Sequence, residues 1–214
     1  MPSQIVDEAV EGYMRDLLAN RDDPVLLEME QLAEERGFPI VNRHVGVTLE
    51  ILARAVLARR VFELGSGYGY SAYWFSRAAE EVHCTDGDPD NEKLASGFLE
   101  RAGLWDRIRY HVGDAVTSLR SVEGDFDIVY NDIDKHGYPE AWLVARERIR
   151  PGGLYICDNV LWSGRVVEDP PQEDVRPGWT EAIREHNTLV SDDRRYLSSI
   201  LPIRDGVMLA IRVD

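Results

Sequence analysis

From residue 59 onward, short strand-like runs alternate with helical patterns, and this alternation restricts the possible folds more than any other feature of the chain. Runs rich in β-branched and aromatic residues occupy 61–64, 81–85, 107–112, 126–131 and 153–157. Helical patterns occupy 70–79, 89–102, 114–120 and 137–149. Parallel strands need crossovers of this length, and such crossovers place helices on both faces of a sheet. The sequence therefore predicts an α/β fold.

The segment that precedes this alternation is different, because it has no strand-like run. Apolar residues at helical spacing occupy 3–19, 24–36 and 44–58. No break in composition and no linker rich in proline and serine divides the chain, and its 214 residues suffice for one large core. We therefore predict one domain over 1–214, with N-terminal helices at 1–58 and an α/β core at 59–214.

The C-terminal segment predicts a change of strand direction. After a helical pattern at about 177–190, the runs "RRYLSSILPI" and "GVMLAIRV" flank Asp205 and Gly206, a dipeptide suited to a tight hairpin turn. We expect the sheet to end in an antiparallel pair.

Composition excludes some classes of protein. A formal net charge of -15 argues against a general nucleic-acid binder or an anionic-membrane binder, since both need basic surfaces. No apolar run approaches the roughly 20 residues of a membrane span, and the acidic N-terminus is unlike a signal peptide. We expect a cytoplasmic protein in which the two cysteines, Cys84 and Cys157, stay unpaired and partly buried. The basic residues are 22 arginines and two lysines, Lys93 and Lys135.

The stretch "FELGSGYGYS" runs from a predicted strand into a predicted helix and indicates a cofactor loop. Gly65, Gly67 and Gly69 allow the backbone to approach a ligand closely. A dinucleotide-binding fingerprint needs glycine at position 70, which is Tyr70 here, so a nicotinamide-type oxidoreductase is disfavoured. A glycine-rich turn without a ligand is the other interpretation.

Two later strand ends supply residues for the rest of a nucleoside. Asp86 follows Gly65 by 21 residues, at a strand end where a carboxylate can accept both ribose hydroxyls. At the end of the third strand, Asp114 and the Ala115 backbone are placed to meet an adenine. The structural alternatives are a solvated turn for Asp86 and a helix N-cap for Asp114.

Oxygen-bearing side chains follow the fourth and fifth strands. Asp132 ends "FDIVYND", and Asp158 with Asn159 ends "GGLYICDN". If these strands are neighbours, roughly 5 Å of strand spacing separates their ends, and oxygen ligands favour Mg²⁺ or Ca²⁺. Each motif alone is explained by capping, with Asp132 or Asp134 as the cap, or by a turn. The two together predict a metal site at the edge of the sheet.

With these motifs, the chain resembles the cation-dependent O-methyltransferases of the caffeoyl-CoA and catechol type over nearly its whole length. The similarity rests on "FELGSGYGYS", "GDA", "DIDK", "DNVLWSGRV", "LPIRDGVMLAIR" and "PIVNRHVG". It implies an S-adenosylmethionine-binding, Rossmann-like class I methyltransferase with a seven-stranded sheet of order 3-2-1-4-5-7-6 and an antiparallel last strand. It also implies a divalent cation, Mg²⁺ before Ca²⁺ or Mn²⁺, and a homodimer. Tyr130, Asn131 and Ile133 depart from the family pattern without removing a ligand.

The resemblance also implies roles for individual residues. For the methionine end of the cofactor it implies Val41, Glu63, Gly65 and Ser71, with Asp86 at the ribose, Asp114 and Ala115 at the adenine, and Asp132 beside the cofactor. For the cation it implies Asp132, Asp158 and Asn159 as ligands. Lys135 becomes a base or a charge stabiliser, and Trp162 an apolar wall for the acceptor unless it is an ordinary core residue. The segment 165–179 is expected to close over the acceptor.

The implied chemistry agrees with the residue types. A catechol hydroxyl has a pKa near 10, and chelation of both vicinal oxygens favours the oxyanion. Lys135 can take a proton, which an arginine cannot readily do. We expect a phenolic, catechol-like or other vicinal-diol acceptor. A hydroxylated uridine in tRNA is the second candidate, and a nucleoside-binding module without catalysis is the third.

Overall fold

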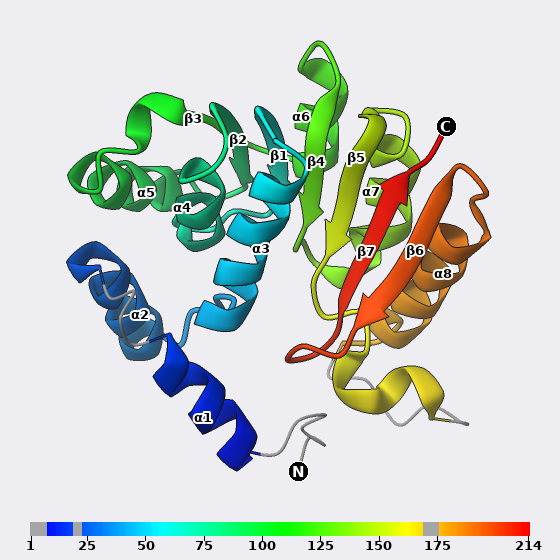
Figure 1. Cartoon of the computed structure of the whole chain (residues 1–214), viewed down its shortest axis with the longest axis horizontal. Coiled ribbons are helices and arrows are strands. Elements are labelled where there is room, and N and C mark those ends of the chain that lie inside the picture. Colours follow the sequence, from blue (N-terminus) through cyan, green and yellow to red (C-terminus); the bar gives the residue numbers. More distant parts are fainter. Residues whose placement is uncertain (1–7, 19–22, 169–175) are drawn as a thin grey trace.

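The computed structural model describes residues 8–18, 23–168 and 176–214 of the chain. A seven-stranded sheet of order β3-β2-β1-β4-β5-β7-β6 forms its centre, and helices flank the sheet (Figure 1). This order confirms the fold class and the strand order that the resemblance implied. β1 pairs in parallel with β2 and β4, β3 with β2, and β5 with β4, whereas β7 runs antiparallel to both β5 and β6.

The strands match the predicted runs closely. They are β1 (Arg60–Leu64), β2 (Glu81–Asp86), β3 (Ile108–Val112), β4 (Phe126–Asn131), β5 (Ile149–Cys157), β6 (Tyr196–Leu201) and β7 (Val207–Arg212). The helices are α1 (Glu8–Leu17), α2 (Pro24–Arg36), α3 (Arg43–Ala55), α4 (Tyr70–Ser76), α5 (Pro89–Arg101), α6 (Ala115–Ser121), α7 (Tyr138–Ala145) and α8 (Trp179–Asp192). Short 3-10 turns occupy η2 (Trp105–Arg107), η3 (Lys135–Gly137) and η4 (Trp162–Val167).

Alternating side chains of the strands supply two hydrophobic cores, one on each face of the sheet. Ile128 and Ile156 belong to the core that also contains side chains of α2, α3, α4 and α5. Val129 and Tyr155, one residue away on each strand, belong to the core with α6, α7 and α8. Because successive side chains point to opposite faces of a strand, a continuous apolar run in β4 or β5 serves both cores.

β5 begins four residues earlier than predicted, and the preceding helix is correspondingly shorter. The helical pattern at 137–149 divides into η3, α7 and a turn, after which Ile149 pairs with Phe126. Pro151 disfavours a helical conformation at Arg150, so the helix does not continue into the residues that begin β5. A register shift between Phe126 and Ile128 then restores the pairing of Ile128 with Leu154.

The connection between β6 and β7 is longer than the predicted two-residue turn. Leu201 pairs with Val207, so the five residues 202–206 form the loop. Arg204 and Gly206 both have positive φ angles, +52° and +83°. The antiparallel pair was predicted correctly, whereas the tight turn was wrong because Pro202 offers no N–H for a ladder hydrogen bond directly after β6.

α1 carries exposed apolar side chains, and Figure 1 shows it extending away from the sheet. Val10 is 48%, Tyr13 66% and Leu17 60% exposed. Ile5 and Val6, the first residues of the predicted stripe, lie outside the described residues.

Both cysteines, Cys84 and Cys157, are buried and free. In the described part of the chain, every helix is too short or too polar to cross a membrane.

Candidate active site

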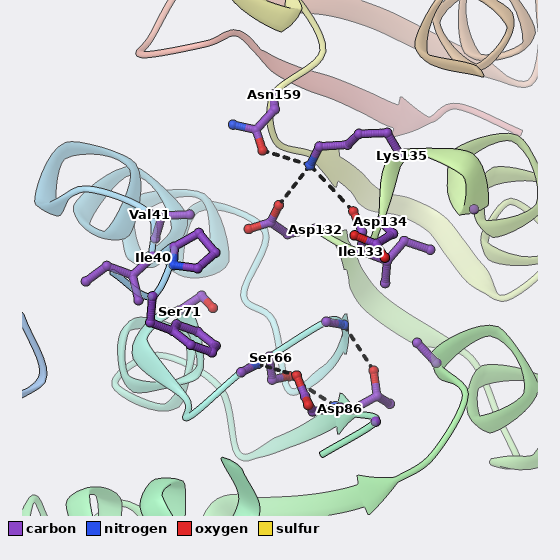
Figure 2. A pocket seen from close by; sticks show the side chains of 18 of the residues that line it. Ile40, Val41, Ser66, Ser71, Asp86, Asp132, Ile133, Asp134, Lys135 and Asn159 are labelled. Atoms are coloured by element: carbon purple, nitrogen blue, oxygen red, sulfur yellow. Dashed lines mark hydrogen bonds and ion pairs between the residues drawn. The ribbon is translucent and has the colours of Figure 1, made fainter. Parts of the chain in front are cut away.

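A cleft of about 780 Å³ lies at the carboxyl ends of the central parallel strands. Of the residues predicted for the site, ten line it: Val41, Gly65, Ser71, Asp86, Asp114, Ala115, Asp132, Lys135, Asn159 and Trp162. Figure 2 shows Lys135 between Asp132 and Asn159 at one end of the cleft, with Ser66 and Asp86 at the other. Glu63 and Asp158 are fully buried behind its walls. The sequence motifs therefore converge on one cavity.

The glycine loop passes close to the end of β4. Gly65 has a φ of +83°, and a Cβ there would lie 2.7 Å from the carbonyl oxygen of Asp132. The loop is also fastened to β2, because the Ser66 N–H donates to the Thr85 carbonyl (2.7 Å) and the Gly65 N–H to the Thr85 hydroxyl (3.1 Å). Glycine at position 65 is required both by the left-handed backbone and by this contact.

Glu63 lies beneath the loop instead of facing the cleft. Its carboxyl group accepts a hydrogen bond from the hydroxyl of Ser71, which does line the cleft. Burial raises the pKa of Glu63 to about 7. Glu63 is therefore placed to fix the Ser71 hydroxyl, and its predicted role at the methionine end of the cofactor stays a prediction.

The Asp86 carboxylate is held rigidly at the end of β2. One oxygen accepts from the Asp88 N–H (2.8 Å) and the Asn91 amide (3.0 Å), and the other accepts from the Gly67 N–H (3.1 Å). A carboxylate offers about four acceptor positions, so at least one remains for a ligand hydroxyl. The turn interpretation and the ribose interpretation are thus compatible.

Asp114 caps α6, as the structural alternative proposed. Its side chain accepts from the Thr117 N–H (2.7 Å), and hydrogen bonding from the Thr117 side chain and then from this N–H lowers the pKa of Asp114. Asp114 and Ala115 nevertheless border the cleft, at the end opposite Lys135. Val41, from the segment between α2 and α3, lines the cleft with a side chain that is almost fully buried.

The pairing of β4 with β5 brings the oxygen-bearing residues together. Asn131 is opposite Cys157, so Asp132 and Asp158 follow at adjacent strand ends. Asn159 comes next, with a left-handed φ of +57°. Neither Asp132 nor Asp134 caps the following helix through its side chain, which leaves the capping interpretation of this motif without support.

Lys135 connects the two motifs. Its ammonium group lies 2.9 Å from Asn159 Oδ1, 3.4 Å from Asp132 Oδ1 and 2.5 Å from the Tyr138 hydroxyl. The Tyr138 hydroxyl in turn donates to the Asp158 carbonyl (2.8 Å), so it accepts from Lys135. These acceptors use the three N–H groups of a charged lysine.

The charges around the two carboxylates are close to balance. Burial raises the pKa of Asp132, and the neighbouring Asp158 raises it further. Burial also raises the pKa of Asp158, while Arg204 opposes this effect by donating to Asp158 Oδ2 at 3.2 Å. Asp158 Oδ1 is buried and has no hydrogen-bond partner among the described residues. An unpaired buried carboxylate oxygen is costly, and a bound cation would satisfy it.

These donors fit a hard divalent cation. Two carboxylates and one amide oxygen are the ligand types that Mg²⁺ and Ca²⁺ select, and water completes such sites. Within the described residues there is no cluster of three or more His, Cys, Asp or Glu side chains that could hold a metal ion. The case for a cation here rests on the oxygen chemistry of Asp132, Asp158 and Asn159, which is that of Mg²⁺ or Ca²⁺ sites and not that of zinc sites.

Comparison with known proteins agrees with this geometry. The O-methyltransferase family model matches residues 19–213. The chain belongs to this family. A catechol O-methyltransferase of Niastella koreensis is 31% identical, covering 95% of this chain and 96% of its own length. Caffeoyl-CoA O-methyltransferase 1 of Eucalyptus globulus is 26% identical, covering 91% and 84%.

A solved structure extends the similarity to the fold. The O-methyltransferase TomG of Streptomyces achromogenes, involved in tomaymycin synthesis and crystallised with S-adenosylmethionine, superimposes with a TM-score of 0.87 at 27% identity, covering 100% of both chains. The protein is thus a methyltransferase enzyme with the class I fold that the sequence predicted.

The methyltransferase has an aromatic rim at the Lys135 end of the cleft. Trp162 lines the cleft and also packs against the core, with its ring 5.5 Å from that of Trp179. The guanidinium of Arg176 lies 4.7 Å above the Trp179 ring. Of the predicted segment 165–179, Arg176 and Trp179 thus border the cleft, while residues 169–175 lie outside the described part of the chain.

Tyr138 and Arg204 were not predicted for the site, whereas Trp179 is the last residue of the predicted segment 165–179. Tyr138 is fully buried beside Lys135, and Arg204 reaches Asp158 from the loop between β6 and β7. The one signal in the sequence for Arg204 is its place in "LPIRDG", directly before the residues expected to turn.

Proposed function

We propose that this O-methyltransferase transfers the methyl group of S-adenosylmethionine to one hydroxyl of a catechol or another vicinal diol, with the help of a divalent cation. The observation that carries the proposal is the convergence of Asp132, Asp158 and Asn159 with Lys135 at one end of the cleft. The catechol O-methyltransferase of Niastella koreensis, similar over nearly its full length, supports the choice of acceptor.

In this proposal the cofactor occupies the end of the cleft formed by the glycine loop. Asp86 accepts from the ribose hydroxyls, and Asp114 with Ala115 borders the adenine. Gly65, Ser71 and Val41 surround the methionine end, with Ser71 held in place by Glu63. The complex of TomG with S-adenosylmethionine supports the choice of cofactor.

The acceptor occupies the other end, between the aromatic rim and the proposed cation ligands. A bound divalent cation would lower the pKa of the acceptor hydroxyl and fix the direction of its oxygen. Asp132, Asp158 and Asn159 would hold the cation, and Trp162 would form the wall beside the acceptor ring. Lys135 acts on the acceptor hydroxyl, either by taking its proton or by stabilising the oxyanion. The protein's contribution is mainly orientation, which is worth up to roughly 7 to 11 kcal/mol in well-aligned cases.

A methyl-transfer assay tests the proposal. Purified protein is incubated with tritiated S-adenosylmethionine and either catechol or tRNA, with Mg²⁺ or with EDTA. We expect label in catechol only when Mg²⁺ is present. Label in tRNA alone would replace the diol acceptor by hydroxyuridine, and full activity in EDTA would remove the cation from the proposal. Calorimetric titration with S-adenosylmethionine and with NAD checks the cofactor separately.

Asp86→Ala is expected to weaken S-adenosylmethionine binding at least about tenfold, because the ribose hydroxyls lose a charged acceptor. Calorimetry measures the affinity, and circular dichroism checks the fold. If the alanine variant is unstable, Asp86→Asn is measured instead, because it keeps the shape of the side chain. Asp90→Ala is the control, since Asp90 lies in the same turn, is 74% exposed and is outside the cleft. Unchanged affinity in both Asp86 variants would remove Asp86 from the ribose site.

We also propose that the enzyme is a homodimer, because α1 exposes Val10, Tyr13 and Leu17 together. Light scattering is expected to give twice the mass of one chain at micromolar concentration. Replacing Tyr13 and Leu17 by glutamate should then shift the mass to that of the monomer, since buried unpaired charges are costly at an interface. A monomer mass for the unmodified protein would rule the dimer out.

A further inference from the structure

Backbone strain gathers at the acceptor end of the cleft. Five residues other than glycine have positive φ angles in the described chain, and four of them belong to this region: Asn159, Trp162, Ser163 and Arg204. The left-handed conformation costs of order 1 kcal/mol or more for residues other than glycine, asparagine and aspartate. Such strain persists where the surrounding structure uses the side chain, which directs attention to Arg204, the one cation among the four.

Arg204 lies between two cavities. It borders the cleft and also a second, open cavity of about 660 Å³, which is lined by residues of α1, α2 and the segment 37–43. The two cavities share Arg204, Tyr70 and the segment 38–41 as a common wall. A single aromatic ring with two hydroxyls needs little of this space, so the site has room for an acceptor with a substituent that extends from the ring.

The guanidinium of Arg204 has donors to spare. Within the described residues it makes one hydrogen bond, from Nη1 to Asp158 Oδ2, and its side chain is 33% exposed. An arginine offers five N–H donors in a planar fork that matches a carboxylate. Asp158 therefore holds one edge of the guanidinium in place and leaves other donors for a ligand.

Two of the neighbouring cations, Arg43 and Lys135, are already engaged. Arg43, which borders the second cavity, makes two hydrogen bonds to Glu30 at 3.0 and 2.6 Å. Lys135 is surrounded by Asp132, Asn159 and Tyr138. In a chain with a net charge of -15, an anionic substituent would be repelled unless it met a cation such as Arg204.

We propose that Arg204 selects acceptors in which the catechol ring carries a carboxylate, and that this carboxylate pairs with the guanidinium where the two cavities meet. This inference rests on the proposed catechol O-methyltransferase function and adds the class of acceptor to it. Arg204 is the specificity-determining residue, and the ring hydroxyls remain at Asp132, Asp158 and Asn159.

The test uses matched acids and alcohols. Protocatechuate is paired with protocatechuyl alcohol, and caffeate with caffeyl alcohol, so that each pair differs mainly in charge. For the unmodified enzyme we expect a higher kcat/KM for the acid of at least one pair. Arg204→Asn keeps a residue that tolerates the left-handed backbone, and it should reduce the acid-to-alcohol ratio about tenfold to 100-fold, the range of a lost charged hydrogen bond. Arg204→Lys should give an intermediate ratio, because an ammonium lacks the planar fork.

A control variant and a binding measurement complete the test. Arg120→Gln, a change at an exposed arginine outside both cavities, should leave the ratio unchanged. The same pairs are also titrated calorimetrically in the presence of S-adenosylhomocysteine, so that the acid-to-alcohol affinity ratio is measured even without turnover. Equal losses for acids and alcohols in Arg204→Asn would mean that Arg204 only supports Asp158, and this overturns the proposal. Equal kcat/KM values for the acid and the alcohol of both pairs in the unmodified enzyme would overturn it too. Absence of methyl transfer to every diol would contradict the proposed function, while the affinity ratios would still decide the role of Arg204.

Discussion

Asp158→Ala is expected to lose both divalent-cation binding and methyl transfer. Residues that only support metal ligands typically change affinity or activity by 10- to 100-fold, so removal of a direct ligand should cost more than about 100-fold. Asp158 is fully buried and its Oδ1 atom lacks a partner in the described structure, so no other side chain is placed to replace it. Calorimetric titration with Mg²⁺ gives the cation affinity, and the tritiated-methyl assay gives the turnover.

Asp125→Ala provides the control for this variant. Asp125 is exposed at the opposite end of β4, so its loss should leave cation affinity and turnover unchanged. The Asp158 variant must also keep its affinity for S-adenosylmethionine, which shows that the fold persists. If Asp158→Ala binds Mg²⁺ as tightly as the unmodified protein, Asp158 is not a ligand.

Lys135→Met is expected to cut turnover by roughly 10²- to 10⁴-fold, the range for the loss of a group that moves a proton in the reaction. Methionine is similar in length to the buried lysine side chain and cannot be protonated. Cation and S-adenosylmethionine affinities should change little, because Lys135 is not a proposed ligand of either. Lys93→Met is a matched control, since Lys93 is the other lysine of the chain and is 74% exposed on α5.

Lys135→Arg distinguishes the two roles left open for this position. A guanidinium keeps the charge but does not accept a proton near neutral pH, so a proton-taking role predicts little recovery. The present contacts of Lys135 use its N–H groups as donors to Asn159, Tyr138 and Asp132. An arginine variant with near-normal turnover would therefore show that position 135 acts through its charge alone.

The α/β alternation and the edge of the sheet at which the site motifs meet could be predicted because both depend on local patterns, whereas the strand order was implied by the family resemblance. A strand followed by a polar residue marks a carboxyl end, and parallel strands bring such ends to one edge, so Asp86, Asp132 and Asp158 could be assigned together. The limits of β5 and of the final turn were less predictable. Pro151 and Pro202 act there through single backbone positions that a periodic pattern does not register.

The remaining features depend on contacts between distant parts of the chain. Arg204 meets Asp158 across 46 positions, and the sequence around Arg204 says nothing about which carboxylate it will reach. Glu63 is a second residue whose surroundings could not be predicted. The family resemblance implied that Glu63 helps to hold the methionine end of the cofactor, but the sequence does not show that its carboxyl group lies under the loop and bonds to Ser71.

The contact between Gly65 and the Asp132 carbonyl bears on how enzymes of this kind can diversify. It joins the end of the cleft proposed for the cofactor to the end proposed for the acceptor through backbone atoms, so no side chain at the contact can adapt to a change on either side. If the proposed function holds, mutation can alter the acceptor through the loops that carry Trp162 and Arg204, while the distance between the two ends stays fixed. We therefore expect related enzymes to acquire new acceptors through changes at the aromatic rim and at Arg204. The relative position of methyl donor and acceptor should stay the same in them.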